Sequence, residues 1–115
     1  MNEPSFAIDP LTAVLEDWPL EPEQVVAGEP QVSGLVLHES EDGRVERGIW
    51  QHTAGVSTDV EADELFVVLS GRASVEIAGG AVLELRPGSV AVLKAGDQTI
   101  WHVHETLRKI YQVTH

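Results

Sequence analysis

The stretch DELFVVLSGRASVEI (residues 63–77) is followed by Gly79-Gly80 and then by RPGSVAVLKAGDQTIWHV (residues 86–103). It contains three short runs of mostly β-branched and aliphatic residues, Leu65–Leu69, Ser74–Ile77 and Val90–Leu93. Glycine and proline interrupt these runs at short intervals, and both residues favour tight turns. Short apolar strands separated by turn residues are typical of a small antiparallel β-barrel or sandwich. The sequence therefore predicts an all-β fold.

Two spacings within this stretch resemble the cupin motifs. Glu64, six residues and Gly71 match the second half of the first motif, G-x5-H-x-H-x3/4-E-x6-G. Gly88 and Gly96 fit the second motif, G-x5-P-x-G-x2-H-x3-N. The resemblance implies a cupin-type antiparallel β-barrel, the double-stranded β-helix or jelly roll. All of the metal-binding histidines of the two motifs are absent from this chain. Lys94, Thr99 and Val103 stand where the second motif has proline, histidine and asparagine, and the H-x-H pair before Glu64 is missing.

Longer pieces of the chain extend this resemblance over residues 22–114. They are RGIWQHTAG (47–55), DELFVVLSGR (63–72), RPGSVAVLKAG (86–96) and WHVHETLRKIY (101–111). In their order and spacing they are similar to the short single-domain cupins related to the (S)-ureidoglycine aminohydrolase cupin domain and to the ethanolamine-utilisation cupins. This similarity implies a small molecule in the barrel lumen, and it suggests hydrolase chemistry as one alternative.

The chain divides into an N-terminal arm, residues 1–30, and a single barrel domain, residues 31–115. Asp9–Glu16 predicts a short helix or turn, with Asp9 as its cap. Alternatively, the resemblance implies that Ser5–Ile8 adds a strand to a neighbouring subunit. Trp18–Pro22 predicts an extended segment, because residues before proline avoid the helical conformation.

The remaining strands follow from apolar runs between turn residues. We expect Asp42-Gly43 to close a hairpin, since Asp-Gly is a strong hairpin signal. The expected elements are strands at Val32–His38 and Val45–Thr53, a loop at Val56–Asp63, and two final strands at Thr99–Thr106 and Leu107–Val113.

Composition excludes several classes of function. The 115 residues carry a net charge of −12, which repels phosphate backbones and argues against nucleic-acid binding. No apolar run is long enough to span a membrane, and the N-terminus predicts no signal peptide. The absence of cysteine removes disulfides and thiolate sites and favours a cytoplasmic location.

Alternation along the strands predicts which side chains enter the lumen. If Glu64 points inward, so do Phe66 and Val68. An outer apolar face that needs cover is then formed by Leu65, Val67 and Leu69, and this predicts a homodimer. The same alternation predicts six further lumen residues, Trp50, His52, Thr99, Trp101, Lys109 and Tyr111, and we assign ligand binding to all of these except Lys109.

Metal binding has few candidate ligands. His102 and His104 share one strand face, but alternation places that face outside. His52 with Glu64 is the better pair, yet two ligands make a poor site for ions that prefer four to six. We therefore predict no cofactor, and we name His52 and Glu64 as the ligands if a divalent metal does bind.

Glu64 and Lys109 are the candidate catalytic residues. A carboxylate inside an apolar barrel is costly unless it is paired or protonated. Glu64 either lies hydrated at the mouth, or is neutralised by an arginine such as Arg72, or pairs with Lys109 in a partly dry pocket. In the last arrangement the pair could bind a polar ligand or transfer a proton. The tryptophans then form either the walls of a site or simple core filling.

Two principal functions remain open. The first is a small-molecule-binding cupin without metal. The second is a metal-dependent hydrolase or isomerase acting on a small polar nitrogenous or sugar-like substrate, in which the metal activates water. A purely structural dimer module is a third alternative.

Overall fold

The computed structural model describes residues 4–115, and within them the fold is all-β apart from one turn of 3-10 helix. This confirms the predicted fold class. The elements are β1 (Glu16–Asp17), η1 (Pro22–Gln24), β2 (Val25–Ala27), β3 (Val32–Glu39), β4 (Val45–His52), β5 (Gly55–Val60), β6 (Asp63–Ile77), β7 (Val82–Leu85), β8 (Val90–Leu93) and β9 (Gln98–Thr114).

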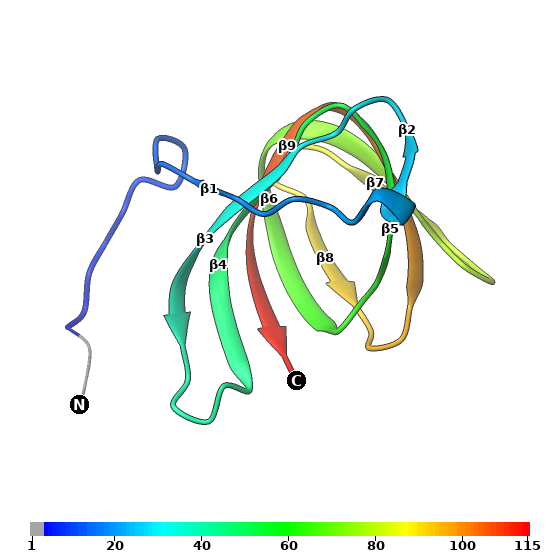
Figure 1. Cartoon of the computed structure of the whole chain (residues 1–115). Helices are drawn as coiled ribbons and strands as arrows, with labels where there is room; N and C mark the ends of the chain where they lie inside the picture. Colours follow the sequence, from blue (N-terminus) through cyan, green and yellow to red (C-terminus); the bar gives the residue numbers. More distant parts are fainter. Residues whose placement is uncertain (1–3) are drawn as a thin grey trace.

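All the strands belong to one antiparallel sheet that curls into an open barrel (Figure 1). The order β1-β3-β4-β9-β5-β2 forms one path, and β6 joins it by pairing with β9. β4 pairs with the C-terminal half of β9 and β5 with its N-terminal half. On the other side, β8 and β7 pair with successive halves of β6. The two long strands therefore form the spine of the barrel.

β6 and β9 are each longer than the sequence predicted. Leu65–Leu69 and Ser74–Ile77 are halves of one 15-residue strand, and the two expected final strands are one 17-residue strand. The register between them shifts three times around Val68–Ala73, where β6 bends. Gly71 lies at this bend with φ +91°, and a Cβ there would overlap the carbonyl of Thr106. Glycine was expected to end a strand, but here it lets a continuous strand bend.

Two further expectations about local structure need correction. Val56–Asp63 is not a loop, because most of it is β5, which pairs with β9. Asp9–Glu16 forms no helix: of the two alternatives the turn is right, and Asp9 Oδ1 accepts the Leu11 amide at 2.9 Å. The predicted hairpin is confirmed, with Gly43 at φ +71° between β3 and β4.

The N-terminal arm crosses the mouth of the barrel, between β1 and η1 (Figure 1). We call residues 18–24 the strap. One end is held where β1 pairs with β3 and the Trp18 amide donates to the Val32 carbonyl at 2.9 Å. At the other end the Gln24 side chain donates to the Thr58 carbonyl at 3.0 Å, and β2 pairs with β5. Gly34 makes room for the strap, since a Cβ there would overlap the Trp18 ring.

Alternation along the spine is confirmed. Phe66 and Val68 are buried in the core, whereas Leu65 is 47% exposed on the outer face. His104 is exposed and His102 is partly exposed, so the outward placement of this pair is also right. The core is a cluster of eleven buried residues, all of them on the two spine strands and on β7 and β8: Phe66, Val68, Ala73, Val75, Leu85, Ala91, Leu93, Trp101, Val103, Leu107 and Tyr111. Among the described residues there is no helix long and apolar enough to cross a membrane.

Candidate functional site

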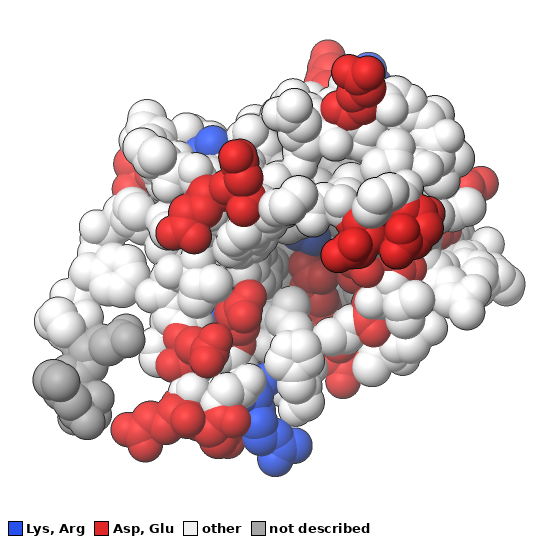
Figure 2. Space-filling model, viewed as in Figure 1, with Lys and Arg blue, Asp and Glu red and all other residues white. Residues whose placement is uncertain are grey.

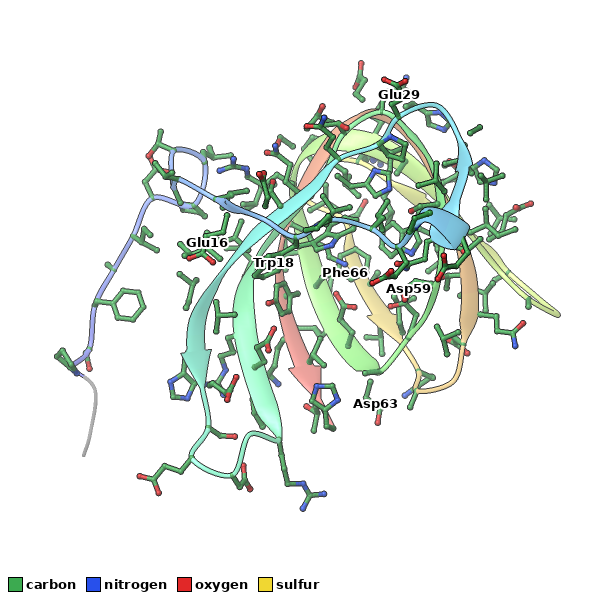
Figure 3. All side chains as sticks on the ribbon, in the orientation of Figure 1. Glu16, Trp18, Glu29, Asp59, Asp63 and Phe66 are labelled. Carbon is green, nitrogen blue, oxygen red and sulfur yellow. The ribbon has the colours of Figure 1, made fainter. Side chains whose placement is uncertain are left out.

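A cavity of about 300 Å³ opens at the end of the barrel that the strap crosses. Trp18 and Leu20 of the strap form one wall, and Trp50 of β4 and Trp101 of β9 form others. All three tryptophans of the chain therefore line this cavity. In Figure 3 Trp18 lies on the strap, Phe66 lies on β6 within the barrel, and Asp59 lies on β5 near the opening.

Glu64 and Lys109 form a buried ion pair in this cavity. The Lys109 Nζ lies 2.8 Å from the Glu64 Oε2, and the two side chains are only 5% and 7% exposed. β6 positions the glutamate and β9 positions the lysine, on the inner faces of two adjacent strands. Arg72 does not contribute, because it pairs with Glu105 on the outside. Of the alternatives for Glu64, the pair with Lys109 is the one that forms.

Three aromatic rings enclose the lysine ammonium. Its Nζ lies 4.3 Å from the ring centroid of Trp50, 4.3 Å from that of Phe66 and 4.6 Å from that of Trp101. The ring faces carry partial negative charge, so each contributes about 0.5–2 kcal/mol to holding a cation. The rings also pack on one another, with Trp50 and Trp101 centroids 5.2 Å apart. This arrangement compensates the lysine for its lost water.

Burial acts against the charge on Glu64. Desolvation raises the pKa of the Glu64 carboxyl above its ordinary value, and the Lys109 ammonium opposes that rise without cancelling it. The nearby Glu61 carboxylate adds to the rise. A buried carboxyl with a raised pKa, beside a cation and facing a cavity, is a candidate functional group.

Glu61 is a second buried carboxylate of the cavity, and the sequence analysis missed it. The residue is 8% exposed, and its Oε2 accepts hydrogen bonds from the Thr99 hydroxyl at 2.6 Å and from the Trp101 indole N–H at 3.1 Å. The acidic run Glu61-Ala62-Asp63-Glu64 was the available signal. This signal was not used because residues 56–63 were predicted to be a loop, whereas Glu61 directly follows β5 and is buried.

His52 is buried, but both of its ring nitrogens are engaged. Nδ1 lies 2.6 Å from the Thr53 carbonyl oxygen, which can only accept, so Nδ1 carries the proton. Nε2 therefore accepts from the Ser57 hydroxyl at 2.8 Å. Burial lowers the pKa of the imidazole below its ordinary value, and the Lys109 ammonium lowers it further. The structure thus favours a neutral His52. Its ring packs beside that of Trp50, with the two ring centroids 5.5 Å apart.

The predicted site residues separate into two groups. Glu64, Lys109, Trp50, Trp101 and Tyr111 all line the cavity. The Tyr111 hydroxyl donates to the Glu46 carboxylate at 2.5 Å, and burial together with this acceptor raises the pKa of the phenol.

His52 and Thr99 lie beside the cavity and do not line it. Their hydrogen bonds hold residues that line it instead, Ser57 in one case and Glu61 in the other. For the strap residues Trp18 and Leu20 the sequence predicted only an extended segment. Their place in the cavity wall depends on how the arm folds back, which residue types alone do not specify.

A metal would find few ligands here. Among the described residues, no three His, Asp or Glu side chains are grouped so that they could hold an ion, and there is no cysteine. His52, the candidate ligand, would have to give up its bond to Thr53 or to Ser57. The side chains present therefore do not fit the three-histidine, one-glutamate centre of the cupin motifs.

Comparison with known proteins supports the fold at the level of a family. The model of the EutQ-like cupin domain matches residues 39–111, and no curated protein matches the sequence. The EutQ protein of Clostridium difficile has 19% sequence identity and a TM-score of 0.72, over 94% of this chain and 85% of that one.

A protein of unknown function from Pseudomonas syringae pv. tomato, of the DUF861 family, has 24% identity and a TM-score of 0.79 over 90% of this chain. This chain spans 45% of that protein. At these identities the two structures show a shared fold and nothing about ligands. The family model covers well over half of the chain, and the chain therefore belongs to the EutQ-like cupin domain family.

Proposed function

We propose that this cupin domain binds a small polar molecule in the barrel cavity, beside the Glu64–Lys109 pair. The observation that carries the proposal is the pair itself, buried, enclosed by three aromatic rings and facing a cavity of about 300 Å³. A cavity with apolar walls and a few fixed polar groups is the usual form of a small-molecule site. The alternative of core filling does not explain why an ion pair lies there.

The metal-dependent hydrolase or isomerase alternative has less support. It needs an ion to activate water, and the described side chains offer no group of three ligands. The ligand-binding role needs only the groups that line the cavity. A cytoplasmic location remains part of the proposal, favoured by the absence of cysteine.

Tryptophan signals provide the test, because all three tryptophans line the cavity. We expect a bound molecule to move the indole N–H signals of Trp50 and Trp101 in the nuclear magnetic resonance spectrum of the labelled protein. The four-carbon probes n-butylammonium, 1-butanol and butyrate cover the three charge classes. Glu64→Gln and Lys109→Met should each abolish the response while the barrel stays folded, and Arg72→Met, in the exposed ion pair, should keep it.

A further variant tests the proposal even if Glu64→Gln and Lys109→Met fail to fold. Ala62 lines the cavity and takes no part in the ion pair. Ala62→Leu should reduce the volume available to a ligand and suppress the response with the ion pair intact. An unchanged response in Ala62→Leu would place the bound probe elsewhere and contradict the proposal.

We also propose that the domain forms a homodimer through the outer face of β6 and β8. Leu65 is 47% exposed, Val90 is 64% exposed and Val92 is 54% exposed, and Leu65 pairs directly with Val92 across the two strands. β8 pairs only with β6 among the described strands, so its other edge is free to accept a partner. A contiguous apolar face at an open edge favours self-association.

A further inference from the structure

The cavity carries an excess of negative charge. Its lining includes four acidic residues, Glu46, Asp59, Glu61 and Glu64, and within the described part of the chain Lys109 is the one lysine or arginine among them. Lys109 is bound to Glu64. The other three carboxylates form no ion pair with any described residue. Figure 2 shows acidic side chains gathered around the hollow on this face.

Glu61 is the most deeply placed of the unpaired carboxylates. Its Oε2 accepts two hydrogen bonds, but both donors, Thr99 and Trp101, are neutral. Its other oxygen, Oε1, accepts no hydrogen bond from a described residue. No described side-chain oxygen that is fully buried lacks a partner, so Oε1 is not fully buried, and Glu61 is one of the residues that line the cavity. A cavity-lining carboxylate that is only 8% exposed thus keeps one oxygen that accepts no hydrogen bond from a described residue.

The field of Glu61 acts on its neighbours. Lost solvation raises the pKa of the buried Glu64 and also that of Asp59, which lies exposed at the edge of the cavity, and in both cases the Glu61 carboxylate adds to the rise. Carboxylates that oppose one another's ionisation in a partly dry space are stabilised by a cation placed among them. The protein's own cation fills this role only in part, because the Lys109 ammonium is bound to Glu64 and opposes the rise in the pKa of Asp59 and of Glu64 without cancelling it.

The walls favour an organic cation over a metal ion. No three ligands are grouped for a metal among the described residues, whereas Trp101 sets its indole beside Glu61. Apolar walls and a single fixed carboxylate suit an alkylammonium, which has both an apolar body and a charged head.

We infer that the cavity selects small organic cations, with the ammonium group of the ligand donating to Glu61 Oε1 beside the indole of Trp101. The inference rests on the proposed function, and it adds the charge class of the ligand and the residue, Glu61, that recognises this charge. Glu64–Lys109 then shapes the site and holds the aromatic walls, while Glu61 provides the charge that the ligand neutralises.

The test compares probes that differ in charge and share a four-carbon chain. The full chain, labelled with ¹⁵N, is titrated with n-butylammonium chloride, 1-butanol or sodium butyrate, and the three indole N–H signals are followed. We expect n-butylammonium to shift Trp101 and Trp50 saturably, 1-butanol to bind roughly 10-fold or more weakly, and butyrate not to bind. Glu61→Gln keeps an acceptor for Thr99 and Trp101, and it should weaken n-butylammonium binding by roughly 10- to 100-fold.

Glu84→Gln is the matched control, because Glu84 lies on the outer face, exposed and bonded to Ser74. It removes the same charge from the protein and should leave the affinity unchanged. If Glu61→Gln and Glu84→Gln weaken binding equally, the effect comes from the net charge of the protein, and this would overturn the role of Glu61.

Each other outcome also decides the question. Butyrate or 1-butanol binding as tightly as n-butylammonium would overturn the charge selection and leave ligand binding in the cavity intact. No shift with any probe would count against both. Selective broadening of the Trp101 signal by equimolar Mn²⁺ would assign the carboxylates to a metal ion and contradict an organic cation.

Discussion

Two ion pairs join the same two strands of this domain, one on each face of the sheet. Inside the barrel, Glu64 of β6 meets Lys109 of β9 with the side chains 7% and 5% exposed. Outside, Arg72 of β6 meets Glu105 of β9 at 3.2 Å with the side chains 60% and 62% exposed. Both pairs put opposite charges within hydrogen-bonding distance, yet they should differ greatly in energy, because water screens the outer pair and has been removed from the inner one.

The difference shows how a structural contact is told from a functional one. The outer pair lies directly across the two strands, where opposite charges add modestly to pairing. The inner pair takes two charges out of water at a site where apolar residues would pack with no such cost. Because this pair lies beside a cavity, ligand binding is the role that we propose for it.

The largest expected effect is the loss of one inner partner. Lys109→Met leaves the Glu64 carboxylate buried without its cation, and it should lower the free energy of unfolding at pH 7 by about 3–5 kcal/mol. Arg72→Met should lower it by about 0–1 kcal/mol. Urea denaturation followed by circular dichroism measures both. Equal losses would mean that water reaches the inner pair and that the distinction between the two faces is wrong.

A double-mutant cycle sharpens the comparison. Glu64→Gln combined with Lys109→Met removes both charges, so the double variant should be more stable than the sum of the single losses predicts, by about 1–3 kcal/mol. The matched cycle of Arg72→Met and Glu105→Gln should show a coupling below about 0.5 kcal/mol. The same urea experiment applies, and additive losses for the inner pair would show that the two charges do not depend on each other.

The pH dependence should come from the inner face as well. Because burial lowers the pKa of His52, the unfolded chain takes up a proton at this residue at a higher pH than the folded one. The stability that His52 contributes is therefore present above pH 6.5 and is lost as the pH falls below it, by at most about 1.4 kcal/mol per pH unit.

His52→Asn should flatten the profile between pH 6.5 and the acid limb, and urea midpoints across that range check it. His104→Asn, on the exposed outer face, is the control and should leave the profile unchanged. A profile that His52→Asn leaves unchanged, or one that His104→Asn flattens equally, would show that His52 is not held neutral.

The smallest effect on stability should come from the outer apolar face. Leu65 is 47% exposed, so Leu65→Glu should cost the monomer little, yet it puts a charge into the proposed dimer interface. Light scattering should give twice the chain mass of 12.5 kDa for the wild type and the single mass for the variant. A wild type that is already monomeric at micromolar concentration would remove the proposed dimer.

Sequence patterns predicted the inner face well because alternation is local. Once Glu64 was placed inward, Phe66 and Val68 followed, and the same reasoning brought Trp101, Lys109 and Tyr111 into the barrel. The position of Gly71 was predictable, but its effect was not. Whether a glycine ends a strand or bends it depends on the strand that passes beside it, here the backbone at Thr106.

The parts of the site that the sequence did not predict depend on contacts between residues far apart in the chain. Glu61 and the strap enter the cavity only because β5 pairs with β9 and the arm folds back over the mouth. Neither event leaves a periodic signal in residues 18–24 or 56–63. The role proposed for the Glu61 carboxylate could therefore be inferred only from the structure.

The central claim is that the inner ion pair serves ligand binding. The most direct test follows the indole N–H signals of Trp50 and Trp101 while n-butylammonium, 1-butanol and butyrate are added in turn to the wild type, to Glu64→Gln and to Arg72→Met. The account predicts that at least one probe shifts both signals in the wild type and in Arg72→Met, and that no probe shifts them in a folded Glu64→Gln. A response that survives in Glu64→Gln, or is absent from the wild type with all three probes, would contradict it.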